Sequence, residues 1–158
     1  MKKLLLIIGY LFFAVSLFAQ VKVYDEKADA VKQINEAVYQ ANKADKYVLV
    51  QVGGNWCPWC LKFAEFAQDD SLVSRIVKEN YIYIHVNWSK ANKNPQAMKM
   101  LENPARFGFP VFVILDEKGK RIHTQNSAYL EEGKEYSEKK VVEFLTKWTK
   151  KAINDYSK

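Results

Sequence analysis

The only two cysteines of the chain are separated by two residues, in the run Cys57-Pro58-Trp59-Cys60. The apolar residues 47–52 before them predict a strand, so a helix that begins at Cys57 would place its sulfur at the helix N-terminus. Unpaired N–H groups and the positive end of the helix dipole stabilise a thiolate there. A thiolate is the nucleophile of disulfide exchange, and a thiol one turn along the helix can resolve the mixed disulfide. The spacing therefore predicts a redox-active pair.

Three other interpretations of the pair are weaker. A disulfide that only staples the fold occurs in exported proteins, but closing so short a loop removes little entropy from the unfolded chain. A zinc site would need both cysteines and both histidines, His85 and His123, which lie far from the pair in the sequence. A Cu(I) site is unsupported, since no methionine or histidine lies within the motif. We expect no metal and no cofactor beyond a Cys57–Cys60 disulfide.

The first nineteen residues have the pattern of an export signal. Lys2 and Lys3 precede an apolar stretch, and Ala19 is a small residue suited to cleavage. As a helix, residues 4–19 would extend about 24 Å, less than the roughly 30 Å hydrocarbon core, so a retained membrane anchor is the weaker alternative. We expect a signal peptide at 1–19, a single domain at 20–158, and a periplasmic or secreted mature protein.

The charge pattern gives no sign of a nucleic-acid partner. The chain has 24 Lys and Arg residues against 18 Asp and Glu residues, and the two signs are interleaved as on a solvated surface. No basic block with interleaved aromatic residues occurs. We therefore expect no nucleic-acid partner and, for one domain without a dimerisation segment, a monomer.

Strand and helix patterns alternate along the rest of the chain. Asp25 is a candidate cap for a helix whose apolar residues recur between 28 and 41. Gly53 and Gly54 are expected to form a tight turn before the cysteine helix. Further predicted elements are a helix break at 69–70, a helix at 72–79, a strand at 81–86, a loop at 88–94, a helix at 95–101, strands at 111–115 and 120–125, and a final helix capped by Ser137 that includes residue 152. This order predicts a three-layer α/β/α sandwich with a central mixed sheet.

Together with Phe109-Pro110 before a later strand, the Trp-Cys-x-x-Cys run makes residues 26–150 resemble the thioredoxin superfamily. The similarity is greatest to exported bacterial thioredoxin-like proteins. The resemblance implies a thioredoxin-like fold. It also implies that Cys57 is the exposed attacking thiol and Cys60 the more buried resolving thiol.

The resemblance also assigns an environment to the pair. Trp56 would shield it, and Pro58 and Trp59 would tune it. Pro110 would match the family's cis-proline, and Phe109 would offer its main chain to an extended substrate. From the residues alone, Pro110 is an ordinary proline at a strand start, because most X–Pro bonds are trans.

One departure from the family lies on the buried side of the pair. Six residues before Cys57, where thioredoxin has a buried aspartate, this chain has Gln51, which can hydrogen-bond but cannot titrate. His85 on the next strand is a candidate proton relay to Cys60 in its place. The alternative is a histidine that is merely satisfied on a strand face.

Trp59 is the second departure, because oxidising members carry histidine there. Without that histidine, the first thiol relies on the helix terminus and on Lys62, which predicts a less depressed thiol pKa. Trp59 also adds apolar area for binding a protein substrate, together with Trp56, Phe109 and the more weakly placed Trp88.

These features predict a thiol–disulfide oxidoreductase that acts on exported proteins carrying disulfides or thiols. We expect it to reduce more than oxidise, with electrons from a membrane-bound partner. The alternative is a thioredoxin-fold binding or chaperone-like module in which the disulfide is structural. A binding module should tolerate loss of both cysteines, whereas an oxidoreductase should not.

Overall fold

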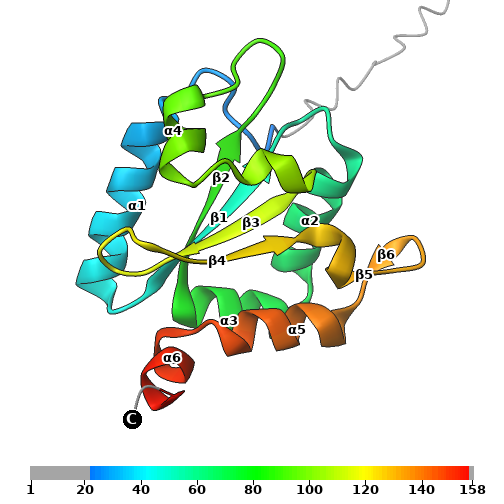
Figure 1. The fold of residues 1–158 in the computed structure, drawn as a ribbon. Helices are drawn as coiled ribbons and strands as arrows, with labels where there is room; N and C mark the ends of the chain where they lie inside the picture. The colour runs from blue at the N-terminus through cyan, green and yellow to red at the C-terminus, as the bar shows by residue number, and fades with distance from the viewer. Residues whose placement is uncertain (1–21, 157–158) are drawn as a thin grey trace, which may run out of the picture.

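The computed structural model describes residues 22–156, so the predicted signal peptide lies outside the described residues. The main sheet has the strand order β2-β1-β3-β4 and is covered by helices on both faces (Figure 1), which confirms the predicted α/β sandwich. β1 pairs in parallel with β2 and antiparallel with β3, so the sheet is mixed. The strands are β1 Tyr47–Gly53, β2 Tyr81–Asn87, β3 Val111–Leu115 and β4 Arg121–Asn126.

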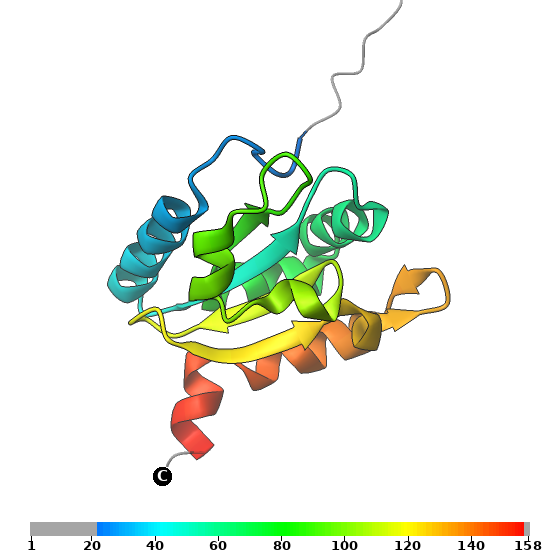
Figure 2. The same ribbon diagram turned by 45° about the horizontal axis from the view of Figure 1, so that its top comes forward.

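The helices divide between the two faces of the sheet, as Figures 1 and 2 show. One layer contains α1 and α4, and the other contains α2, α3 and α5. None of the helices within residues 22–156 has the length and apolarity needed to cross a membrane. The bounds are α1 Ala30–Ala44, α2 Pro58–Asp69, α3 Ser71–Asn80, α4 Pro95–Met100, α5 Glu138–Lys147 and α6 Lys150–Tyr156, with short 3₁₀ helices η1 Pro104–Phe107 and η2 Ser127–Leu130 and a small hairpin of β5 Glu131–Glu132 and β6 Glu135–Tyr136.

The alternation of side chains along β1 decides which residues reach the cysteine helix. Val50 lies in the core beneath α1 and α4, and Leu49 lies in the core beneath α2, α3 and α5. Because successive strand residues point to opposite faces, Gln51 shares the face of Leu49 and points toward α2. His85 lies opposite Gln51 in the parallel pairing and therefore shares this face.

The predicted cap of the first helix is wrong. α1 begins one residue after Asp29, whose side chain accepts the backbone N–H of Lys32 at 3.1 Å. Asp25 instead begins a short turn, in which its side chain accepts the Lys27 N–H at 2.9 Å and its carbonyl accepts the Ala28 N–H at 3.3 Å. Asn55 accepts the Tyr24 N–H at 3.1 Å and donates to the Tyr24 carbonyl at 2.8 Å, so this segment is fixed to the cysteine loop.

The predicted single C-terminal helix is also wrong, because it is divided into α5 and α6. Ser137 precedes α5 but makes no side-chain capping bond. The break has a cap of its own, since Thr149 Oγ1 accepts the N–H of Ala152 at 3.1 Å. Trp148, at the end of α5, stacks on His123 of β4 with the ring centroids 3.9 Å apart.

Removing the cap of α3 should destabilise the fold by about 1 kcal/mol. Asp70 accepts the N–H groups of Leu72 at 3.0 Å and Val73 at 2.9 Å, and Asp70→Ala leaves both donors without that partner. The free energy of unfolding in urea measures the effect. The matched control is Asp69→Ala, because Asp69 is exposed at the end of α2. Equal stabilities of the two variants would contradict the capping role.

Candidate active site

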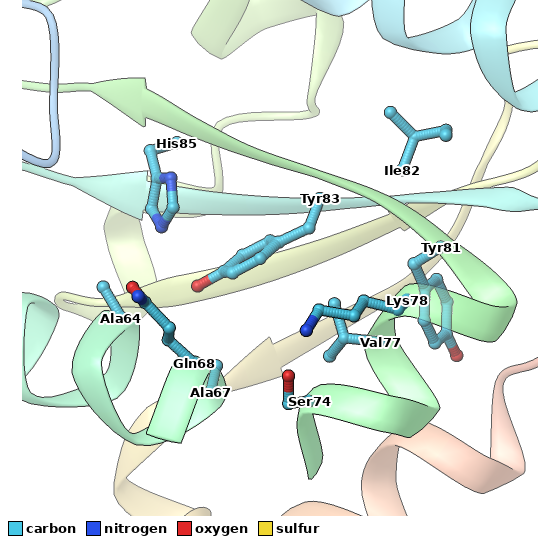
Figure 3. Close-up of a pocket in the computed structure, with 10 residues that line it drawn as sticks. All are labelled: Ala64, Ala67, Gln68, Ser74, Val77, Lys78, Tyr81, Ile82, Tyr83 and His85. Atoms are coloured by element: carbon cyan, nitrogen blue, oxygen red, sulfur yellow. The ribbon is translucent and has the colours of Figure 1, made fainter. Parts of the chain in front are cut away.

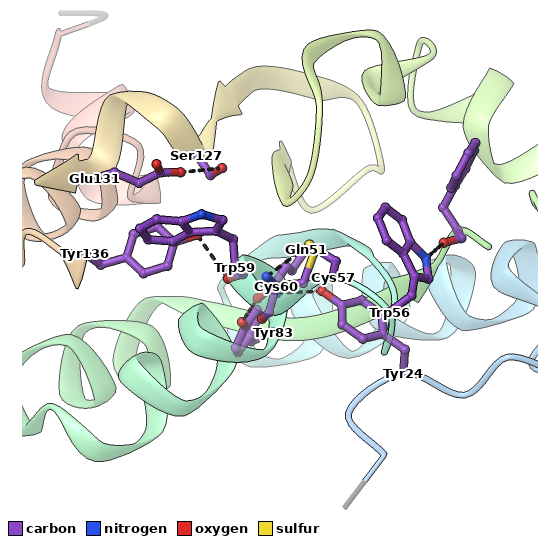
Figure 4. The surroundings of a disulfide bond; sticks show 11 residues. Tyr24, Gln51, Trp56, Cys57, Trp59, Cys60, Tyr83, Ser127, Glu131 and Tyr136 are labelled. Atoms are coloured by element: carbon purple, nitrogen blue, oxygen red, sulfur yellow. Dashed lines mark hydrogen bonds between the residues drawn. A yellow bond between two sulfur atoms is a disulfide. The ribbon is translucent and has the colours of Figure 1, made fainter. Parts of the chain in front are cut away.

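The two cysteines form a disulfide at the beginning of α2 (Figure 4). Cys57 is the N-cap residue, and its sulfur accepts the backbone N–H of Cys60 at 3.2 Å. Pro58 occupies the first turn, where the missing proline N–H leaves no helical bond unmade. Cys60 is fully buried, as expected, but Cys57 is only 4% exposed, so the expectation of an exposed first cysteine is wrong for this disulfide. Tyr24 and Phe109 pack against the pair and cover it. The helix therefore places the less buried sulfur at its positive end, as the sequence predicted.

An aromatic surface lies beside the disulfide and consists of the exposed Trp56 and the half-buried Trp88 and Phe109. Trp56 is 51% exposed, and its Nε1 donates to the Trp88 carbonyl at 2.8 Å. The ring centroid of Phe109 lies 5.4 Å from that of Trp56 and 4.8 Å from that of Trp88. A pocket of about 490 Å³ opens between the two tryptophans and also contacts Glu26 and Lys90. The structure therefore brings together three of the four aromatic residues predicted to form a contact patch.

The segment before β3 also reaches the disulfide. The peptide bond between Phe109 and Pro110 is cis, and Pro110 is buried. Phe109 packs against the small cluster formed by Tyr24 and the two cysteines. Phe109 thus connects the aromatic surface to the sulfur atoms.

Trp59 points away from that surface, toward the β5–β6 hairpin (Figure 4). Its ring packs edge-on against Tyr136 at 5.3 Å, and the Tyr136 hydroxyl donates to the Trp59 carbonyl at 3.1 Å. The hairpin also binds Lys62, whose ammonium lies 2.9 Å from Glu135 Oε1 and 2.6 Å from the Lys134 carbonyl. Because the Lys62 ammonium is bound to the hairpin, the helix terminus is the main group that can stabilise a Cys57 thiolate.

The buried side of the pair is a hydrogen-bonded network centred on Gln51. Its Nε2 donates to the Tyr24 hydroxyl at 2.5 Å and to the Cys60 carbonyl at 2.8 Å, and its Oε1 accepts from the Tyr83 hydroxyl. Burial raises the pKa of Tyr24 and of Tyr83, so both hydroxyls keep their protons. Sequence analysis missed both tyrosines. Tyr24 carries no local signal, because only the folded chain places it beside a strand that begins 23 residues later.

His85 extends this network along β2. Its ring lies 4.5 Å from that of Tyr83 and 5.4 Å from that of Tyr24. Burial lowers the pKa of His85 to about 4, and its Nε2 is buried without a hydrogen-bond partner. The ring lines a pocket of about 440 Å³ between β2, α2 and α3 (Figure 3). A ring that is neutral at pH 7 is poorly suited to exchange protons there, and the relay stays a prediction.

Comparisons with known proteins agree with this fold. Residues 29–117 match the model of a family described as thioredoxin-like. The chain belongs to the thioredoxin-like family. This confirms the resemblance drawn from the sequence. Comparison with curated proteins finds no significant match.

Comparison with solved structures finds one that is similar in fold and a second with a more limited match. A disulphide isomerase from Xylella fastidiosa Temecula1 superposes with a TM-score of 0.69 at 22% identity, covering 78% of this chain and 94% of that one. A structure described as DsbH oxidoreductase gives a TM-score of 0.44 at 22% identity, covering 58% of this chain and 68% of that one.

Replacing His85 should make the free energy of unfolding less dependent on pH in the acidic range. An unfolded histidine has a pKa near 6.5, whereas burial lowers the folded value to about 4. Between these two pH values the unfolded chain binds a proton that the folded chain does not, so stability is full above pH 6.5 and falls by up to about 3 kcal/mol toward pH 4. His85→Gln should lose much less stability over that range, as measured by urea unfolding at each pH. Parallel curves for variant and wild type would show that His85 does not carry this effect.

Proposed function

We propose that the protein is a thiol–disulfide oxidoreductase that reduces exported proteins. The observation that carries the proposal is the asymmetry of the disulfide. Cys57 lies at the N-terminus of α2 beside the aromatic surface, whereas Cys60 is fully buried behind it. One sulfur is thus placed to react with a substrate and the other to complete the reaction.

The reaction proceeds in two exchange steps. The Cys57 thiolate attacks one sulfur of a substrate disulfide, and the other substrate sulfur leaves with the electron pair of the broken bond. Cys60, as thiolate, then attacks the Cys57 sulfur and displaces the reduced substrate, leaving the Cys57–Cys60 disulfide seen here. Two electrons from a reductant restore the dithiol. The pair is its own redox group, and the steps need no cofactor.

The surroundings of Cys57 favour the reducing direction. A thiol pair becomes oxidising when its thiolate is strongly stabilised, as by a neighbouring histidine or lysine. Here the position before Cys60 holds Trp59, and the nearby ammonium of Lys62 is bound by Glu135. The helix terminus remains, which suits a moderately lowered thiol pKa and a reducing pair. In an oxidising compartment such a pair needs a dedicated donor, and we propose a membrane-bound electron-transfer protein.

Protein substrates fit the aromatic surface. Apolar rings of this size are typical anchors of protein contacts, and Phe109 beside the cis bond can offer its main chain to an extended peptide. The disulphide isomerase from Xylella fastidiosa, similar in fold, is consistent with substrates of this class. Export to the periplasm or beyond rests on the signal pattern ending near Ala19. We propose that the mature protein acts as a monomer.

Loss of Cys57 should abolish reduction of the substrate. Loss of Cys60 should stop the reaction after the first exchange step, at the mixed disulfide. With insulin and dithiothreitol, Cys57→Ser should fall to the uncatalysed rate, because no nucleophile remains. Cys60→Ala, reduced beforehand and mixed with insulin after the dithiothreitol is removed, should accumulate a mixed disulfide through Cys57, visible by mass spectrometry, because neither Cys60 nor an added thiol is present to resolve it. Insulin reduction that survives in Cys57→Ser would overturn the proposal and favour the binding module with a structural disulfide.

Loss of Trp56 should weaken the binding of protein substrates and leave the reaction with small disulfides unchanged. Trp56→Ala removes the most exposed ring of the aromatic surface and leaves the cysteines in place. The KM for reduction of a protein disulfide should rise about tenfold, while reactivity with glutathione disulfide stays unchanged. Tyr129→Ala is the matched control, since Tyr129 is 74% exposed but lies outside the aromatic surface. Equal losses with both substrates would show that Trp56 affects the sulfur chemistry instead.

A further inference from the structure

Residues 22–26 form a segment that crosses the cysteine loop, and it is fixed there by its main chain. The side-chain amide of Asn55 accepts the N–H of Tyr24 at 3.1 Å and donates to its carbonyl at 2.8 Å. Asn92 donates to the carbonyl of Glu26 at 3.1 Å and secures the other end. The segment is therefore a built part of the site and positions one side chain, that of Tyr24.

The Tyr24 side chain is directed at the buried half of the disulfide. It is fully buried and clusters with Cys57 and Cys60 (Figure 4). Gly53 shows how close the groups are. A Cβ added to Gly53 would lie 2.8 Å from the Tyr24 hydroxyl oxygen and would clash with the Cys60 sulfur as well. The hydroxyl oxygen and the Cys60 sulfur thus both approach the position that a Cβ of residue 53 would occupy.

The hydroxyl also has a hydrogen to donate. Among residues 22–156, its one hydrogen bond is the bond that it accepts from Gln51 Nε2. A disulfide sulfur is a weak acceptor, but reduction converts Cys60 to a thiol or thiolate, which accepts strongly when charged. Reduction therefore makes the Cys60 sulfur a better acceptor close to the Tyr24 hydroxyl, whose hydrogen is free to be donated.

We propose that Tyr24 is a positioning residue that donates a hydrogen bond to the sulfur of reduced Cys60. This inference rests on the proposed oxidoreductase function and names the group that prepares the resolving thiol. The bond stabilises the Cys60 thiolate, which attacks Cys57 in the second exchange step. Tyr24 keeps its proton throughout, because burial raises its pKa.

Few other groups near this sulfur titrate in the neutral range. No Asp, Glu, Lys or Arg is fully buried within residues 22–156. Burial keeps the tyrosines protonated and His85 neutral at pH 7. The titratable groups packed around the buried side of the pair, from α2, the N-terminal segment, β2 and β6, are Cys57, Tyr24, Tyr83, His85 and Tyr136. A titration observed there near neutral pH belongs to the cysteines.

The test is the rate at which Cys60 resolves a mixed disulfide between Cys57 and glutathione. In this step the Cys60 thiolate forms a bond to Cys57, and glutathione leaves as thiolate. Tyr24→Phe should raise the Cys60 pKa in the pH–rate profile by about one unit, which lowers the thiolate fraction at neutral pH about tenfold. Because nucleophilicity rises with pKa, the resolution rate should fall only about threefold.

Two comparison variants separate this effect from a general disturbance. Tyr83→Phe removes the other hydroxyl that binds Gln51, so it should leave the Cys60 pKa closer to wild type than Tyr24→Phe does. Tyr39→Phe, on the exposed side of α1, should change nothing. Equal shifts of the Cys60 pKa in Tyr24→Phe and Tyr83→Phe, or no shift in either, would overturn the proposal.

The wild-type protein offers a second test that does not depend on a folded variant. With tyrosines labelled at ¹³Cζ, the Tyr24 resonance should shift when glutathione or dithiothreitol reduces the pair, and Tyr39 should not. An unmoved Tyr24 resonance would overturn the proposal. If wild-type Cys57 failed to react with glutathione disulfide at all, the oxidoreductase function would fail, whereas normal resolution in Tyr24→Phe would remove only the role of Tyr24.

Discussion

The close approach of α2 to the end of β1 is the constraint on which the site depends. Gly53 ends the strand, and the sulfur of Cys60 and the hydroxyl of Tyr24 occupy the space where its side chain would lie. Any larger residue would push the cysteine helix away from the sheet. Gly54 has a similar role toward the aromatic surface, because a Cβ there would meet the Trp56 ring and the Trp88 carbonyl. Because the two adjacent glycines have no side chains, the backbone can pack closely against the buried cysteine on one side and against the aromatic surface on the other.

The buried face is polar and uncharged. Gln51 donates to the Cys60 carbonyl and to the Tyr24 hydroxyl and accepts from the Tyr83 hydroxyl, so these contacts are made without a charged group. A buried carboxylate in that position would carry a desolvation cost and would titrate together with the thiol. The amide of Gln51 makes these hydrogen bonds without titrating, so this position holds no internal acid. The sulfur chemistry is thereby separated from protein titration near neutral pH.

Local patterns in the sequence predicted much of this molecule. The apolar run before Cys57, the proline after it and the Cys-x-x-Cys spacing specify a helix start with a sulfur at its N-cap, and the structure has that arrangement. The two glycines were predicted to make a turn, yet neither has a positive φ, and close packing is what requires them. Packing between distant segments is invisible to local patterns. The cap was predicted at Asp25, whereas the structure has it at Asp29, and the contact of Tyr24 with Asn55 carries no local signal.

The site is held from two sides by segments remote in sequence, and this explains the unequal roles of its tryptophans. Tyr136 and the β5–β6 hairpin fix Trp59 from one side, and residues 22–26 close the other. Because Trp59 is half-buried against the hairpin, it contributes rigidity to the first turn of α2 more than area for a partner. Trp56 is exposed and packs edge-on against Phe109 instead, so the aromatic surface lies on the Trp56 side of the pair. The different orientations of the two tryptophans are therefore set by segments outside the cysteine motif.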